Sequence, residues 1–321
     1  MLAVKSNRSK IIILAGIVII ASLFYQFSGI DIEYFSYAMS IRTPKLIVML
    51  ITAFCIGSAS VIFQSIIQNT IVTPCLLGMN SLYILVHTAT VFILGSTSFL
   101  VTNKTLSFSI DLVVMGFASM LIYGYLFKKT KGNVLYILLA GTVMSTFFSS
   151  VTSTLQRIMD PNEYDTLQNA LLASFHKVNS SIIGFSIVLI ALILLLLRKE
   201  LALLNVLTLG KNHAINLGVN YDRSVRRLLL GVTLLIAIAT AMVGPISFLG
   251  LIVANLSRQL FKTYRHSYLI FGSTLIGMVV LIIGQGLIER VFSFSVNISV
   301  FINVGGGIYF LYLLLRNRGN V

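Results

Sequence analysis

Long apolar segments alternate with short polar connections along almost the whole chain. A helix needs about 20 mostly apolar residues to cross a lipid bilayer. Lipid offers the peptide groups no hydrogen-bond partners, so such segments must be helices, whereas a membrane barrel has short alternating segments. The sequence therefore predicts an all-α, polytopic membrane protein with about ten transmembrane helices. The predicted spans are Ile11–Phe27, Leu46–Ile67, Leu76–Leu94, Phe108–Phe127, Val134–Leu155, Ile182–Leu197, Leu228–Val243, Ile246–Leu260, Tyr268–Ile288 and Val296–Leu315.

The composition agrees with a membrane protein that has one domain. Hydrophobic residues make up 57% of the chain, charged residues make up 10%, and the mean hydropathy is +0.97. Ordinary globular domains carry about a quarter charged residues, so the composition argues against a water-soluble fold. No polar block between the apolar segments is long enough to fold separately. Residues 1–321 are therefore expected to form a single transmembrane domain.

The positions of the charged residues predict the orientation of the chain. With ten spans both termini lie on one side, and 17 of the 23 Lys and Arg residues fall on that side, against six opposite. Because cytoplasmic loops carry the excess of basic residues, both termini are expected in the cytoplasm. Most acidic residues, Asp111 and Glu289 among them, are expected near the outer face. The net charge of +14 thus reflects topology and does not imply nucleic acid binding.

The longest cytoplasmic connection, between the sixth and seventh spans, contains a mixed apolar and polar stretch. It reads LNVLTLGKNHAINLG over Leu204–Gly218, with Gly210 and Gly218 as breaks. This pattern predicts one or two short amphipathic helices that lie against another surface. A solvated loop is the alternative interpretation.

Three ordered stretches carry motifs. The first reads IRTPKLIVMLITAFCIGSASVIFQSIIQNTIVTPCLLG from Ile41 to Gly78. The second reads GPISFLGLIVANLSR over Gly244–Arg258, and the third reads LGKNHAINLGV over Leu209–Val219. Together they resemble the permease family of ABC importers for ferric siderophores, haem and cobalamin. The resemblance covers nearly the whole chain.

Most motif residues of that family are present, and a few are replaced. The matching residues in the first stretch are Arg42, Pro44, Gln64, Asn69, Pro74 and Gly78. The replacements are Lys45, Thr70, Ala254 and Asn255. The resemblance, with Thr70, Ala254 and Asn255 and the SVNIS sequence of Ser295–Ser299 in place of the family's residues, favours the branch whose permeases work as nonidentical pairs on ferric siderophores. Pro44 is expected at a helix start, and Gly78, Gly244 and Gly250 are expected where helices pack closely.

The resemblance implies roles for three groups of residues. Those expected to receive acidic side chains of a substrate-binding protein are Arg42, Lys45 and Arg290. Those expected in a cytoplasmic gate are Asn69 and Ile71. Those expected to couple the chain to an ATPase are Leu204, Gly210, Ala214, Leu217 and Gly218. From the residues alone, snorkelling at a helix end and a structural loop asparagine remain open for the first two groups.

The resemblance also implies partners and a location. We expect two ATP-binding subunits, a second and nonidentical permease subunit, an extracytoplasmic substrate-binding protein and membrane lipid, in the bacterial cytoplasmic membrane. The sequence has no GxxxxGK[ST] phosphate loop and no catalytic motif, so the chain is expected to transport a solute and not to act as an enzyme. No cofactor or metal is expected, because the histidines and cysteines lack metal-binding spacing. Haem or cobalamin import and an ion-coupled secondary transporter are the alternatives.

Overall fold

The computed structural model describes residues 2–30, 32–129, 134–171, 175, 180–293 and 295–318, and this part of the chain is helical without strands. The main helices are α1 (Leu2–Phe27), α2 (Phe35–Ile67), α3 (Met79–Leu94), α5 (Lys104–Lys129), α6 (Val134–Ile158), α8 (Ser180–Ala202), α11 (Tyr221–Val243), α12 (Leu249–Phe261), α13 (His266–Arg290) and α14 (Ile298–Arg318). The short elements are η1 (Ile32–Tyr34), η2 (Pro74–Leu77), α4 (Phe99–Thr102), α7 (Pro161–Leu171), α9 (Leu204–Leu207) and α10 (Lys211–Asn216).

The ten main helices correspond to the ten predicted apolar segments, and the all-α class is confirmed. Six helices in the described residues are long and apolar enough to cross a membrane: α1, α2, α5, α8, α11 and α13. Shorter apolar helices occupy Met79–Leu94, Leu249–Phe261 and Ile298–Leu313. The sequence missed α4 and α7, which lie in polar connections and are too short or too polar to appear as apolar segments.

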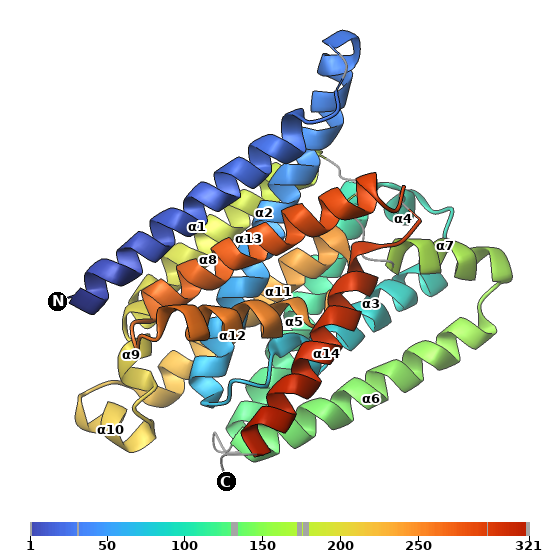
Figure 1. Ribbon diagram of the computed structural model, residues 1–321. Coiled ribbons are helices and arrows are strands. Elements are labelled where there is room, and N and C mark those ends of the chain that lie inside the picture. Colours follow the sequence, from blue (N-terminus) through green and yellow to red (C-terminus); the bar gives the residue numbers. More distant parts are fainter. Residues whose placement is uncertain are drawn as a thin grey trace.

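The helices run between two ends of the molecule (Figure 1). The start of α1, the end of α14 and both short helices α9 and α10 lie at one end, which we call the coupling end. The start of α2, with α4 and α7, lies at the opposite end. The two chain ends thus share one side, as an even number of spans requires.

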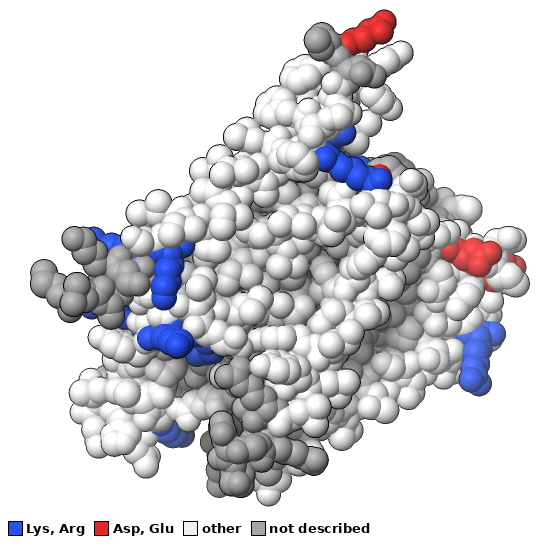
Figure 2. All heavy atoms as spheres, in the orientation of Figure 1, with Lys and Arg blue, Asp and Glu red and all other residues white. Residues whose placement is uncertain are grey.

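Charged side chains lie at these two ends (Figure 2). On the face in view, Lys and Arg gather at the coupling end, while Asp and Glu are seen only at the opposite end, where some basic groups also lie. Most of the surface between them is uncharged. Over the molecule as a whole, large apolar side chains such as Ile12, Ile20, Leu195 and Leu311 are more than half exposed. A surface this apolar suits lipid and not water.

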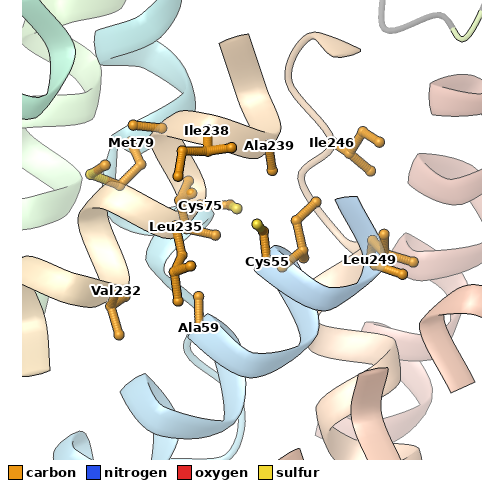
Figure 3. Close-up of a cluster of buried hydrophobic side chains, with 14 of the residues drawn as sticks. Cys55, Ala59, Cys75, Met79, Val232, Leu235, Ile238, Ala239, Ile246 and Leu249 are labelled. Atoms are coloured by element: carbon orange, nitrogen blue, oxygen red, sulfur yellow. The ribbon is translucent and has the colours of Figure 1, made fainter. Parts of the chain in front are cut away.

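Helix α2 is the centre of the core. It packs against α13, α11 and α12, and nearly every residue from Val48 to Ile67 is buried. Figure 3 shows Cys55 and Ala59 of α2 facing Leu235 and Ile238 of α11, with Cys75 beside them. Both cysteines are free and buried, so they act as small apolar side chains.

Small residues let the helices approach α2 closely. A Cβ atom added to Gly57 would lie 3.1 Å from the backbone of Ser273 in α13, and one added to Gly250 of α12 would collide with Ser60. Gly277 of α13 similarly faces Ala53. The prediction that Gly250 lies at a close helix contact is confirmed, and it matches the use of small residues between membrane helices.

Pro44 does not lie at a helix start, as the sequence predicted, but inside α2. The helix begins earlier, at Phe35, because an amphipathic stretch with Tyr37 and Ile41 exposed continues it beyond the apolar segment. Proline inside a helix removes one hydrogen bond and favours a bend. The first turns of α2 project beyond the rest of the bundle in Figure 1.

Candidate transport and coupling sites

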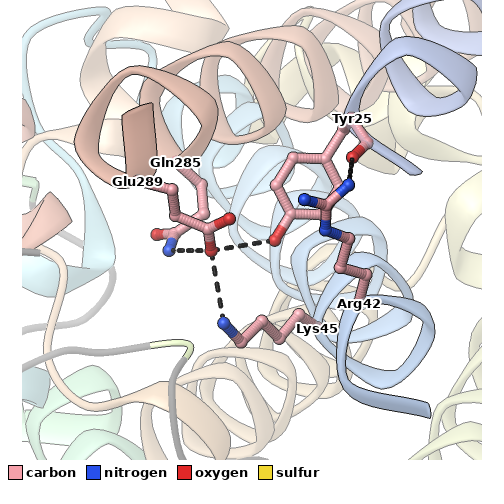
Figure 4. Close-up of polar contacts among 5 residues, drawn as sticks. All are labelled: Tyr25, Arg42, Lys45, Gln285 and Glu289. Atoms are coloured by element: carbon pink, nitrogen blue, oxygen red, sulfur yellow. Dashed lines mark hydrogen bonds and ion pairs between the residues drawn. The ribbon is translucent and has the colours of Figure 1, made fainter. Parts of the chain in front are cut away.

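A polar cluster joins α1, α2 and α13 at the end opposite the coupling end. Glu289 of α13 accepts hydrogen bonds from Tyr25 Oη (3.0 Å) and Gln285 Nε2 (2.9 Å), and its Oε1 lies 3.3 Å from Lys45 Nζ (Figure 4). The side chains of Lys45 and Glu289 are only 9% and 13% exposed. Lys45 therefore forms an ion pair with Glu289 of the same chain. The sequence predicted that Glu289 lies near the outer face but did not predict this pair.

The other two predicted docking residues, Arg42 and Arg290, form hydrogen bonds at the C-terminal end of α1. Arg42 Nη1 donates to the carbonyl oxygens of Tyr25 (3.2 Å), Gln26 (3.1 Å) and Ser28 (2.9 Å). These oxygens have no partner inside the helix, so the guanidinium caps them. Arg290 bonds to Ser28 and lies 4.7 Å above the ring of Phe24. All three predicted residues thus gather at one place, and Arg290 is exposed.

The predicted gate residues form the loop that follows α2. Gln68 ends the helix in a left-handed conformation (φ 53°), and the Asn69 side chain accepts a hydrogen bond from the Ile71 backbone N–H (2.9 Å). Such a turn fixes the loop backbone locally. The carbonyl oxygen of Thr70 accepts from Gln64 Nε2 (2.7 Å) and from Asn255 Nδ2 (2.8 Å).

Two of the residues that depart from the family pattern therefore contact each other. Thr70 replaces a proline and Asn255 replaces a histidine of that pattern, and the hydrogen bond from Asn255 ties the loop to α12. Nothing in the sequence indicated this contact, because the two residues are 185 positions apart.

The predicted coupling segment, Leu204–Gly218, contains two short helices, α9 and α10, and the prediction of short helices there is confirmed. Gly210 joins them at φ 96°, and Gly218 ends the segment at φ 79°. Both values lie in the left-handed region, where a side chain is strained. Leu204 and Ala214 are fully buried within this chain, whereas Leu217 is 62% exposed.

The segment bears an exposed apolar patch beside direct contacts to the gate loop and to α13. Leu209, Ile215 and Leu217 are each more than half exposed, and we refer to these three side chains together as the patch. Gln68 Nε2 donates to the Thr208 carbonyl oxygen (3.1 Å). Asn205 Oδ1 accepts from the backbone N–H of His266 (3.1 Å) and lies 2.6 Å from its ring Nδ1. The coupling segment is therefore hydrogen-bonded to the residue that ends α2 and to the start of α13.

A buried pair between α3 and α5 gives Asp111 a partner. This carboxylate lies about two turns after the start of α5 and is 2% exposed, and its position near the outer face stays a prediction. Its Oδ2 is 2.7 Å from Nδ1 of His87 in α3, and Tyr83 stacks on the His87 ring. The described residues contain no group of three or more His, Cys, Asp or Glu that could hold a metal ion.

The chain belongs to the FecCD transport family, whose model matches residues 11–316. It is 39% identical over 312 residues to the petrobactin import system permease protein YclO of Bacillus subtilis, covering 97% of this chain and 98% of that protein. It is 36% identical to the petrobactin import system permease protein FatC of Bacillus anthracis, over 90% of this chain and 82% of that protein. The protein is therefore a multi-pass membrane permease, and the resemblance seen in its three motifs is confirmed.

A solved structure supports the fold independently. The structure, described as an inward-facing conformation of a metal-chelate type ABC transporter, superposes with a TM-score of 0.81. It covers 96% of this chain and 99% of the other at 22% sequence identity. At that identity the likeness concerns the fold alone.

Proposed function

We propose that this chain forms half of the translocation pathway of an ATP-driven importer for a ferric siderophore. The observation that carries the proposal is the similarity, over nearly the full length, to permeases that are named for petrobactin import. The proposed assembly contains a second, nonidentical permease, two ATP-binding subunits and an extracytoplasmic binding protein. Both chain termini face the cytoplasm in this arrangement.

The ATP-binding subunit docks at the coupling end and drives the conformational change from there. The exposed apolar patch of Leu209, Ile215 and Leu217 docks in a groove of the ATP-binding subunit, since such a patch costs free energy in water. The buried Leu204 and Ala214 hold the short helices on the permease. The hydrogen bond between Gln68 and Thr208 then links their movement to the gate loop of Asn69 and Ile71. The chain contributes binding and conformational change, and bond chemistry stays with the ATP-binding subunits.

Substrate delivery takes place at the opposite end. Arg42 and Arg290 lie at the mouth of the bundle, beside the paired Lys45 and Glu289. Acidic side chains of a binding protein dock against this positive surface, and Lys45 supports it by neutralising Glu289. The alternative cargoes, haem and cobalamin, would use the same architecture.

Reconstitution in proteoliposomes tests the function. The full complex, supplied with its binding protein, should accumulate radioactive iron from ferric petrobactin when ATP is present on the ATPase side. Haem and cobalamin serve as competing substrates, and a non-hydrolysable ATP analogue serves as the control. Accumulation of haem or cobalamin in place of the ferric siderophore would refute the substrate. Uptake that follows an ion gradient without ATP would refute the importer class.

A further inference from the structure

A polar cavity of about 300 Å³ lies at the coupling end, between the gate loop, the coupling segment and the turn that joins α12 to α13. This volume is at the small end of the range for ligand pockets, about 300–1,000 Å³. Its lining residues are Gln64, Ser65, Gln68, Thr70, Thr208, Arg258, Thr263, Tyr264, His266 and Leu269. All but Leu269 carry polar side chains, and none of them is a carboxylate.

The charge of the cavity comes from Arg258. Its guanidinium is partly buried and bonds to two neutral side chains, Gln64 Oε1 (3.4 Å) and Ser65 Oγ (2.9 Å). Within the described residues no carboxylate lies within ion-pair distance of it. The carbonyl ends of α2 and α12 offset part of the charge, but a cation that is partly removed from water is stabilised by an anionic partner.

The start of α13 adds a second attraction for an anion. The first backbone N–H of this helix, that of His266, already donates to Asn205 Oδ1, and His266 and Leu269 of the first turn line the cavity. What the helix start offers an anion is therefore the partial positive charge that a helix carries at its N-terminus. Together with the hydroxyl and amide groups of the walls, this arrangement suits an oxyanion.

We propose that this cavity binds a phosphate-type oxyanion, either as free phosphate or as the head group of an anionic lipid. The occupant contacts Thr208 of the coupling segment and Thr70 of the gate loop, so it stabilises the position of these two elements relative to each other. This site is independent of the transported cargo, and its test does not require transport.

Thermal unfolding of the purified full-length chain in detergent tests the proposal. Sodium phosphate is titrated against chloride of equal ionic strength. The unfolding temperature of the wild type should rise saturably with phosphate, and Arg258→Gln should weaken the apparent affinity at least tenfold. Arg258→Lys should weaken it less, because it keeps the charge and loses the planar fork. Arg265→Gln, an exposed neighbour outside the cavity, should behave as the wild type.

A second variant and a lipid arm complete the experiment. Thr263→Glu keeps Arg258 and brings a carboxylate to the cavity wall, so it should abolish the phosphate response even if Arg258→Gln fails to fold. If the occupant is a lipid head group, nanodiscs of phosphatidylglycerol should stabilise the wild type more than phosphatidylcholine nanodiscs do, and Thr263→Glu should remove that difference. Equal responses of the wild type and Thr263→Glu to both phosphate and phosphatidylglycerol would overturn the proposal.

Discussion

Lys45 and Glu289 form a mostly buried ion pair between α2 and α13. Removing one partner of a buried pair leaves an uncompensated charge, which costs about 3–5 kcal/mol. The sequence identified Lys45 as a basic residue at the mouth but could not identify its partner, which lies 244 positions away. The same limitation applies to His87 and Asp111, since hydropathy does not reveal which polar residues face each other across helices.

Arg290 offers the cleanest test of docking, because it is exposed and forms no ion pair with any described carboxylate. Arg290→Glu should weaken capture of the loaded binding protein roughly tenfold at low salt, and less at high salt, where screening is stronger. Binding of the fluorescent binding protein to permease complexes in nanodiscs measures the effect.

Arg157→Glu is the matched control for that measurement, since Arg157 is an exposed basic residue on the same predicted side, outside the cluster. Its dissociation constant should equal that of the wild type. An equal loss of affinity in both variants would mean that only the net charge of the permease affects binding. An unchanged dissociation constant in Arg290→Glu would show that Arg290 is not part of the docking surface.

At the scale of elements, the coupling segment was largely predictable and the lengths of the helices were not. Gly210 and Gly218 interrupt an apolar pattern, and both occupy left-handed conformations that favour glycine. Hydropathy, however, gives only the length of the apolar segment. A helix can extend beyond that segment wherever its backbone hydrogen bonds are satisfied. The amphipathic first turns of α2 before Pro44 and the short α7 were therefore missed.

Leu217→Asp tests whether the exposed patch transmits force. It replaces an apolar side chain that is 62% exposed with a charged one, so the fold should survive. Loss of a central apolar contact at an interface costs at least about 1–2 kcal/mol, so ATP-driven uptake should fall about tenfold or more. Proteoliposomes containing the complex report assembly, ATPase rate and uptake together.

Asn216→Asp adds the same charge at the neighbouring exposed position without removing an apolar contact, and it should transport normally. Gly210→Val should also impair coupling, because a β-branched side chain is strained at φ 96°. Normal uptake and normal ATPase rates in both Leu217→Asp and Gly210→Val would mean that α9 and α10 are only a connection.

For the whole molecule, the pattern of apolar segments was sufficient to predict the fold class, because every span must satisfy its own backbone in lipid. The order and packing of helices around α2 were not predictable in this way. They depend on contacts between distant small residues, such as Gly57 against Ser273, and on long-range polar bonds such as Asn255 to Thr70. The orientation of the bundle in the membrane rests on the distribution of basic residues and stays a prediction.

Single cysteines at the two ends test that orientation. Cys55 and Cys75 are buried and can be replaced by alanine, after which Asn162→Cys labels exposed α7 and Asn212→Cys labels exposed α10. In right-side-out vesicles an impermeant maleimide should react with Asn162→Cys at once and with Asn212→Cys only after permeabilisation, since basic residues concentrate at the coupling end. Transport by both variants provides the control for correct folding. The reverse labelling pattern would place the coupling end outside, where no ATP-binding subunit could reach it.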